Sequence, residues 1–430
     1  MDDISQGSGR RDFFYGWVVV AACFALGFLV GGIRFSLPLL LPGWVDEFSW
    51  TMAAGSMAIA ITSFAQCGMG MLAGKIIDAR GPKVMAVVGC LLIGTGLVLS
   101  RQASSLVQFY GLFAVLGIGL SAVYLIPSAI VNKWFVQRRG LVTGVVMAGG
   151  GVGTLVLPLI VGRFISVGGW QYAQLFLGIL AFCFTVFAFL LKHYPEDMNL
   201  KPYGQSGEGD KAKSVGEESG FSWTLSQAVR TRAFWLVALI GLASGFGHYI
   251  PWTQLASYIG ELKLPAMLAA YTLSVIGGCS AIGRVWGGRL GDKLGRKAVA
   301  GSCFALQGAA ILYLSQAGTA EAFYLFAVVS GLSHGGMIVQ FAPMLADFYG
   351  RHNLASIMGV FQAITGLGWA LGSWAGGFIF DMAQSYHTAF FVGALSYVVA
   401  IVLLVFIKKP EAVQEGTQKR NNRGADICKL

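Results

Sequence analysis

The amino-acid sequence predicts an all-α membrane protein with twelve transmembrane helices in two six-helix bundles. Of its 430 residues, 56% are hydrophobic and only 12% are charged, a balance that would leave a soluble protein with more apolar surface than it could bury. Apolar runs long enough to cross a bilayer recur along the whole chain, and motifs of the first half return in the second. These three observations together predict the fold class.

The apolar runs give the individual spans, because a hydrocarbon core of about 30 Å needs roughly 20 helical residues. They lie near residues 16–42, 51–74, 84–100, 106–131, 140–166, 170–191, 233–260, 267–288, 298–316, 321–346, 354–380 and 386–407. The first run, from Phe13, is too long for a cleavable signal and lacks a small-residue cleavage site. We therefore expect it to remain as the first spanning helix.

The loop cations predict the orientation, because cytoplasmic loops carry an excess of Lys and Arg. An even number of spans puts both termini on one side. With the N-terminus in the cytoplasm, the cytoplasmic loops receive Lys75, Arg80, Lys83, Lys133, Arg138, Arg139, Arg289, Lys293, Arg296, Lys297 and Arg351, whereas the outer loops receive Arg101, Lys263 and Arg163. We predict a multi-pass protein of the inner (cytoplasmic) membrane with both termini in the cytoplasm.

One long polar stretch, YPEDMNLKPYGQSGEGDKAKSVGEESG, interrupts the apolar pattern, and its Pro, Gly and charge content cannot form a packed core. After it, TLSQAVRTRAFW predicts a short interfacial helix with Thr224 as its N-cap. The predicted units are an N-terminal six-helix bundle (1–192), a cytoplasmic linker (193–224), a C-terminal six-helix bundle (225–409) and a cytoplasmic tail (410–430).

An internal repeat relates the two halves. GKIIDARGPK, from Gly74 to Lys83, matches GRLGDKLGRK, from Gly288 to Lys297, at a displacement of 214 residues, and Gly144 matches Gly359 at 215. In these motifs a glycine lets helices touch, an aspartate caps a helix or pairs with a cation, and the cations hold the loop inside. We expect a conformational latch on the cytoplasmic face, formed by Gly74, Asp78, Arg80, Gly288, Asp292 and Arg296.

These two loops resemble the signature of the major facilitator superfamily and its echo in the second half. DFFYGW (12–17), NKWFVQRRGLVTGVVMAGGGVG (132–153) and RTRAFW (230–235) resemble more narrowly the monocarboxylate transporter family and the related bacterial oxalate/formate antiporters. The resemblance covers nearly the whole chain. It implies a twelve-helix alternating-access bundle with a central site between its halves.

Arg284 is the strongest binding candidate, because an ionised side chain inside the membrane costs at least about 2.5 to 3.5 kcal/mol. It lies eight residues before Asp292, hence roughly 12 Å inside that helix end, and its guanidinium suits a carboxylate. In monocarboxylate transporters an arginine at this place anchors the carboxylate, and the match SAIGRVWGG carries that role to Arg284. The alternative is an arginine that forms a structural pair.

Many animal members of the family also carry an aspartate and a lysine associated with proton coupling, where this chain has Ser280 and Leu39. His248 and His334 are then the titratable groups that remain at depth, and histidine has a suitable unperturbed pKa for a proton relay. Each can equally be a hydrogen-bonded core residue.

Other side chains at similar depth are weaker candidates. The antiporters add a second cation where this chain has Thr365, which favours a monoanion. Arg34, about eight residues before Pro42, either forms a second anchor or snorkels outward. The remaining substrate-binding candidates, each with helix packing as its alternative, are Tyr124, Gln362 and Gln254.

The sequence thus predicts a monomeric transporter that moves a small monocarboxylate such as lactate or pyruvate together with a proton. A carboxylate exchanger, which can include dicarboxylates, and a non-transporting carboxylate sensor are the alternatives. We expect no enzyme, metal, cofactor or nucleic acid: no nucleophile has a paired base, no cysteine or histidine spacing fits a metal, and the net charge of +10 lies in short loops.

Overall fold

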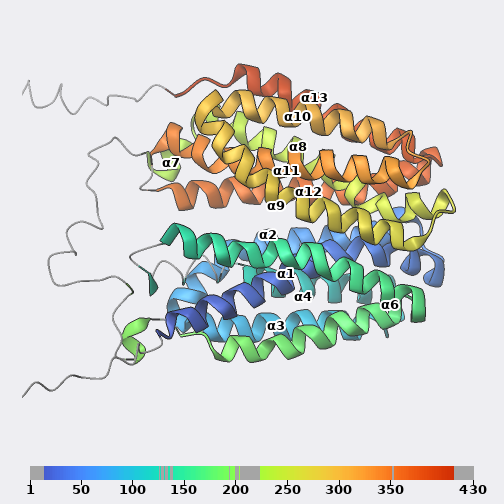
Figure 1. Ribbon diagram of the computed structural model, residues 1–430, viewed down its shortest axis with the longest axis horizontal. Coiled ribbons are helices and arrows are strands. Elements are labelled where there is room, and N and C mark those ends of the chain that lie inside the picture. Colours follow the sequence, from blue (N-terminus) through green and yellow to red (C-terminus); the bar gives the residue numbers. More distant parts are fainter. Residues whose placement is uncertain are drawn as a thin grey trace, which may run out of the picture.

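The computed structural model describes residues 14–124, 126, 130, 134–135, 139–192, 194–198, 203, 223–350 and 353–410. Within these ranges, the side chains of residues 70–80, 139–141, 196–197 and 355 lie outside the description. In the described part the chain is helical apart from connections and one isolated bridge between Phe135 and Tyr203. The long helices run alternately up and down one common direction (Figure 1).

The first half contains α1 (Gly16–Phe48), α2 (Met52–Arg80), α3 (Pro82–Ser100), α4 (Leu106–Tyr124) and α6 (Arg139–Phe189), followed by the short η1 (Pro195–Met198). The second half contains the short α7 (Leu225–Ala228), then α8 (Arg232–Glu261), α9 (Ala266–Leu294), α10 (Arg296–Leu314), α11 (Ala320–Tyr349), α12 (Leu354–Ala383) and α13 (Tyr386–Phe406). Thr224 caps α7 in a capping box with Gln227, as the sequence predicts.

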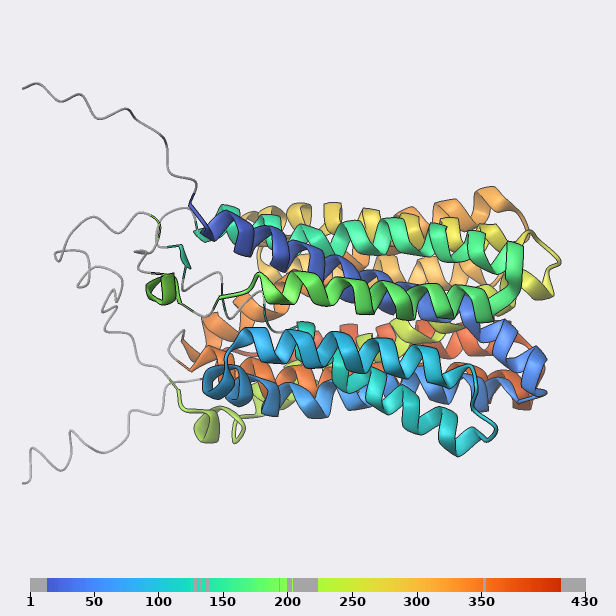
Figure 2. The same cartoon turned by 90° about the horizontal axis from the view of Figure 1, so that it is seen from below.

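Helix α6 accounts for two of the predicted spans. Its 51 residues would extend roughly 77 Å as one helix at 1.5 Å per residue, more than twice the hydrocarbon core. The helical dihedral angles are interrupted at Gly168 and at Gly169, where φ is 75°. The chain turns back there, and the two halves of α6 lie antiparallel (Figure 2). The described part holds 11 helices long and apolar enough to span a membrane, so the divided α6 brings the number of spans to the predicted twelve.

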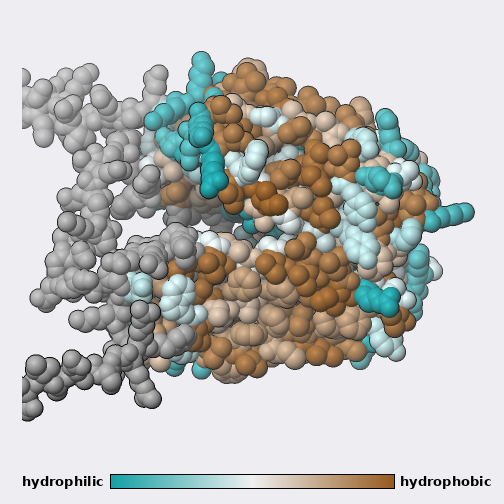
Figure 3. All heavy atoms as spheres, viewed as in Figure 1, coloured by the Kyte–Doolittle hydropathy of each residue, from teal (hydrophilic) through white to brown (hydrophobic). Residues whose placement is uncertain are grey.

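The surface fits a bilayer. Apolar side chains form a broad belt over the middle of the molecule, and hydrophilic ones gather at both ends (Figure 3). Large apolar residues near the middle of the helices are strongly exposed, such as Leu306 on α10 and Val398 on α13, each at 53%. Exposure of this kind is normal for side chains that face lipid.

Helices α1–α6 form one bundle and α8–α13 the other, and the two meet where α2 packs against α12 and α6 against α9 (Figure 1). We call these contacts the two seams. Small residues line them: a Cβ built on Gly377 would lie 2.4 Å from the Met52 carbonyl oxygen, and one on Gly277 would lie 2.5 Å from Thr154 Oγ1. Helix α1 begins and helix α13 ends at the same end of the molecule, which we call the termini end. We call the opposite end the far end.

Candidate functional site

A cavity of about 180 Å³ lies between the two bundles near the middle of the spans. Its walls come from α1, α4 and α6 on one side and from α8, α9, α11 and α12 on the other. Between the bundles the surface is hollowed on the side of the termini end (Figure 3). The volume is below the roughly 300 to 1,000 Å³ of pockets for drug-sized ligands, so the cavity suits a small molecule.

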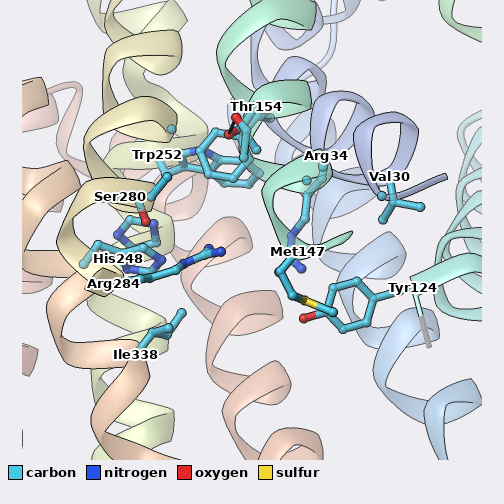
Figure 4. A pocket seen from close by; sticks show the side chains of 18 of the residues that line it. Val30, Arg34, Tyr124, Met147, Thr154, His248, Trp252, Ser280, Arg284 and Ile338 are labelled. Atoms are coloured by element: carbon cyan, nitrogen blue, oxygen red, sulfur yellow. Dashed lines mark hydrogen bonds between the residues drawn. The ribbon is translucent and has the colours of Figure 1, made fainter. Parts of the chain in front are cut away.

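Arg284 points into this cavity from α9 (Figure 4). It lies ten residues before the end of α9 at Leu294, roughly 15 Å inside the termini end. The side chain is exposed, and among the described residues it forms no ion pair. The structure therefore gives this guanidinium access to solvent at membrane depth without a described carboxylate beside it.

Arg34 lines the same cavity from α1 and does not snorkel toward the far end. Its Nε donates a hydrogen bond of 2.8 Å to the hydroxyl of Tyr249 on α8, and Nη2 donates to the same oxygen. The guanidinium carbon also lies 4.4 Å from the ring centroid of Trp369 on α12, within the range of a cation–π interaction. Arg34 therefore connects the two bundles at the cavity wall.

His248 on α8 and His334 on α11 stack face to face, with ring centroids 3.7 Å apart and an interplanar angle of 11°. Both line the cavity and both are buried. Neither Nδ1 has a hydrogen-bond partner among the described residues, and the same holds for the hydroxyl of Ser280 on the neighbouring α9. The C-terminal bundle thus presents a group of buried polar atoms without partners beside Arg284.

Tyr124 closes the opposite wall. It is the last residue of α4, it is 57% exposed, and its hydroxyl points into the cavity across from Arg284 (Figure 4). Gln254 and Gln362 are not among the described residues that line the cavity. Gln254 is fully buried and donates a hydrogen bond to Ser56 on α2, so it lies in a seam.

The charge balance of the cavity is one-sided. Two guanidinium groups, those of Arg34 and Arg284, face it, and the described lining residues include no Asp or Glu. A cleft lined by charges of one sign attracts ions of the opposite sign. An anion that enters the cavity would supply the missing negative charge.

The signature loop of the second half lies at the termini end. Arg296 is 3.6 Å from the carboxylate of Asp292 and 2.6 Å from that of Asp347 on α11, a partner that the sequence analysis did not identify. A Cβ on Gly288 would meet nothing within 4 Å, so in this conformation Gly288 makes no close helix contact of the kind expected of it. The side chains of its first-half counterparts, Gly74, Asp78 and Arg80, lie outside the described residues.

Comparison with known proteins gives the family. A family model described as the Major Facilitator Superfamily matches residues 23–290 and again residues 278–427. The chain belongs to the major facilitator superfamily. It is a multi-pass membrane transporter and not an enzyme, in agreement with the expectation from its two signature loops.

Similar curated proteins of the superfamily include Monocarboxylate transporter 12 of Xenopus laevis, 23% identical over 96% of this chain and 93% of the relative. The Oxalate:formate antiporter of Oxalobacter formigenes is 24% identical over 93% of this chain and 92% of the relative. These are the two groups that the sequence motifs resemble.

Solved structures of the superfamily share the fold. A point mutant of the nucleoside transporter NupG superposes with a TM-score of 0.74 at 14% identity, over 91% of this chain and all of that one. A bacterial homologue of the human lysosomal transporter Spinster, in an inward-facing and occupied conformation, gives 0.66 at 16% identity, over 93% and 96% of the two chains.

Proposed function

We propose that this protein is a secondary transporter of a small monocarboxylate, such as lactate or pyruvate, which crosses together with a proton by alternating access. The observation that carries the proposal is the position of Arg284, exposed in a cavity between the bundles and without a described carboxylate partner. The planar fork of a guanidinium binds a carboxylate through two parallel hydrogen bonds. The monocarboxylate transporter named above supports the same class of cargo.

The rest of the cavity fits a short acid. Tyr124 lies across from Arg284, where its hydroxyl can meet a hydroxyl or keto oxygen of the cargo. Apolar side chains on both walls can receive the cargo's methyl group: Val30, Met147 and Ile338 line the same space. The small volume favours acids of a few carbons.

His248 and His334 are the proton-carrying candidates. Because their rings stack at 3.7 Å, two positive charges on the pair would repel strongly, so the pair takes up a single proton. A cargo anion between the arginines offsets their field and makes room for that proton. One anion and one proton then cross together, and the cycle is electroneutral.

The orientation follows the loop cations: the termini end faces the cytoplasm. The conformation described here is then open inward and closed outward. Rocking of residues 1–192 against 225–409 around the cavity would expose Arg284 first to one side and then to the other.

A second candidate is a carboxylate exchanger for dicarboxylates, favoured by the presence of Arg34 in the same cavity as Arg284. The oxalate:formate relative supports this class. Replacement of Arg34 by Gln separates the two. If Arg34 is not an anchor, lactate uptake survives the change; if it holds a second carboxylate, oxalate exchange is lost.

The test is uptake of labelled lactate into proteoliposomes with a pH gradient across the membrane. Proton symport predicts uptake that rises as external pH falls, and Arg284→Gln should abolish it. Arg163→Gln, an exposed arginine on α6 outside the cavity lining, is the control. Uptake that ignores the pH gradient but responds to a trapped internal anion would establish exchange, and binding without flux would establish a sensor.

A further inference from the structure

Asp381 makes a contact between the bundles that the cargo site does not use. It lies in the last turn of α12. Its carboxylate accepts a hydrogen bond of 2.9 Å from the backbone N–H of Met52 and one of 2.7 Å from that of Ala53. These are the first two residues of α2, so a C-terminal-bundle acid binds the N-terminus of an N-terminal-bundle helix. We propose that Asp381 is a latch that holds the far end closed, separate from the conformational latch predicted at the cytoplasmic face; in this subsection "the latch" means the Asp381 contact.

The chemistry of the contact favours a latch. The first N–H groups of a helix have no partner inside the helix, and they carry the positive end of its dipole. A carboxylate that accepts two of them forms charge-assisted hydrogen bonds, which are about twice as strong as neutral ones. Gly377, one turn earlier on α12, brings the backbones together, since a Cβ there would lie 2.4 Å from the Met52 carbonyl oxygen.

A second polar contact lies deeper in the same seam. Gln254 on α8 donates a hydrogen bond of 2.8 Å to Ser56 on α2, and both side chains are fully buried. Ser56 is one turn after Met52 on α2. Two polar contacts, one at the surface and one below it, therefore fasten α2 to the C-terminal bundle at the far end.

The other seam has no such latch in the described residues. At the displacement of 215 residues that relates Gly144 to Gly359, Asp381 corresponds to Ser166. The Ser166 hydroxyl donates to the Arg163 carbonyl of its own helix, and α9 begins without a side-chain cap. The two seams therefore differ. Opening of the far end has to break charge-assisted hydrogen bonds between α2 and α12, whereas between α6 and α9 it separates packed small side chains.

The latch can be tested without any cargo. Spin labels at Gln102→Cys and His387→Cys, exposed positions near the far end of the two bundles, would report far-end opening by double electron–electron resonance in nanodiscs. Accessible native cysteines are replaced first. Asp381→Asn keeps the side-chain volume but removes the charge, and we expect the ratio of open to closed far ends to rise by about tenfold.

Met52→Pro removes one N–H donor and leaves Asp381 intact. Proline is tolerated at the first position of a helix, so this variant can replace Asp381→Asn if the latter folds poorly. We expect it, too, to shift the far end toward the open state. The control is Asp46→Asn, an exposed acid at the far end of α1.

Unchanged distances in both latch variants, or an equal shift in the Asp46 control, would overturn the proposal. The readout does not depend on which molecule is carried. Failure of the carboxylate assignment would therefore leave the latch standing, and loss of the latch would leave that assignment untouched.

Discussion

Gly287 and Gly288 are neighbours on α9 with opposite surroundings. A Cβ on Gly287 would lie 2.5 Å from Gly336 Cα on α11, whereas one on Gly288 would meet nothing within 4 Å. We take Gly288, in the signature loop, to be the residue that meets the N-terminal bundle when the termini end closes. Valine at position 287 should then lower stability, and valine at position 288 should slow transport.

Both changes remove a glycine from a helix interior, so the gain in helix propensity is similar and the difference in stability reports the clash. Gly287→Val forces the α9 and α11 backbones apart, and overpacking of this kind costs about 1 to 3 kcal/mol. Gly288→Val should fold normally, because nothing opposes the side chain in this conformation. It should nevertheless slow transport about tenfold or more, since the same steric cost now falls on the closed state.

Thermal unfolding of the purified proteins and lactate uptake into proteoliposomes separate these effects. Gly287→Val should unfold at a lower temperature than the wild type, and Gly288→Val should unfold at the wild-type temperature but transport poorly. Normal transport by Gly288→Val would refute the role of this glycine in closing the termini end. Wild-type stability of Gly287→Val would refute the packing on which the comparison depends.

Three further predictions concern other parts of the fold. His334→Gln should retain lactate counterflow but lose the rise of uptake with falling external pH, because glutamine holds no proton; an unchanged pH profile would remove His334 from the coupling. Gly169→Ala should lower thermal stability by about 1 to 3 kcal/mol, since φ of 75° and ψ of −175° form a backbone region that glycine alone adopts readily; wild-type melting would contradict this. Asp347→Asn should change the free energy of unfolding by less than about 1 kcal/mol, as its ion pair with Arg296 is exposed; a large loss in a melting assay would show a stronger network.

The sequence was sufficient to predict where each helix begins and ends and how deep a residue lies within its helix. The lengths of the apolar runs predict the spans, and the glycines at 168–169 fall in the gap between the fifth and sixth runs, where the structure divides α6. Depth can be counted in residues, which is why Arg284 was expected far inside the membrane. Family membership follows from the two signature loops and the repeat.

Rotation about the helix axis was not predictable in the same way. Gln254 and Arg34 both lie inside apolar helices, yet one enters a seam and the other the cavity. Which way each points depends on packing against helices far away in sequence: Arg34 meets Tyr249, 215 residues further on. The stacking of His248 on His334 has the same origin, since α8 and α11 supply one ring each.

The contact of Asp381 with α2 also lay beyond the sequence. An aspartate at a helix end is usual at a membrane surface, and nothing in its neighbours identifies the N-terminus of another helix as its partner. The separation of 329 residues along the chain is closed only by the packing of the two bundles.

Equilibrium binding of lactate to the purified protein tests the central claim most directly. Isothermal titration calorimetry would compare the wild type with Arg284→Gln and with the control Arg163→Gln, an exposed position outside the cavity lining. Because hydrogen bonds to a charged group contribute about 1.5 to 3 kcal/mol, we predict at least about tenfold weaker binding for Arg284→Gln and unchanged binding for the control. All three proteins should unfold at one temperature, since Arg284 has no described ion-pair partner to lose. Equal lactate affinity in the wild type and Arg284→Gln would contradict the assignment of this arginine as the carboxylate anchor.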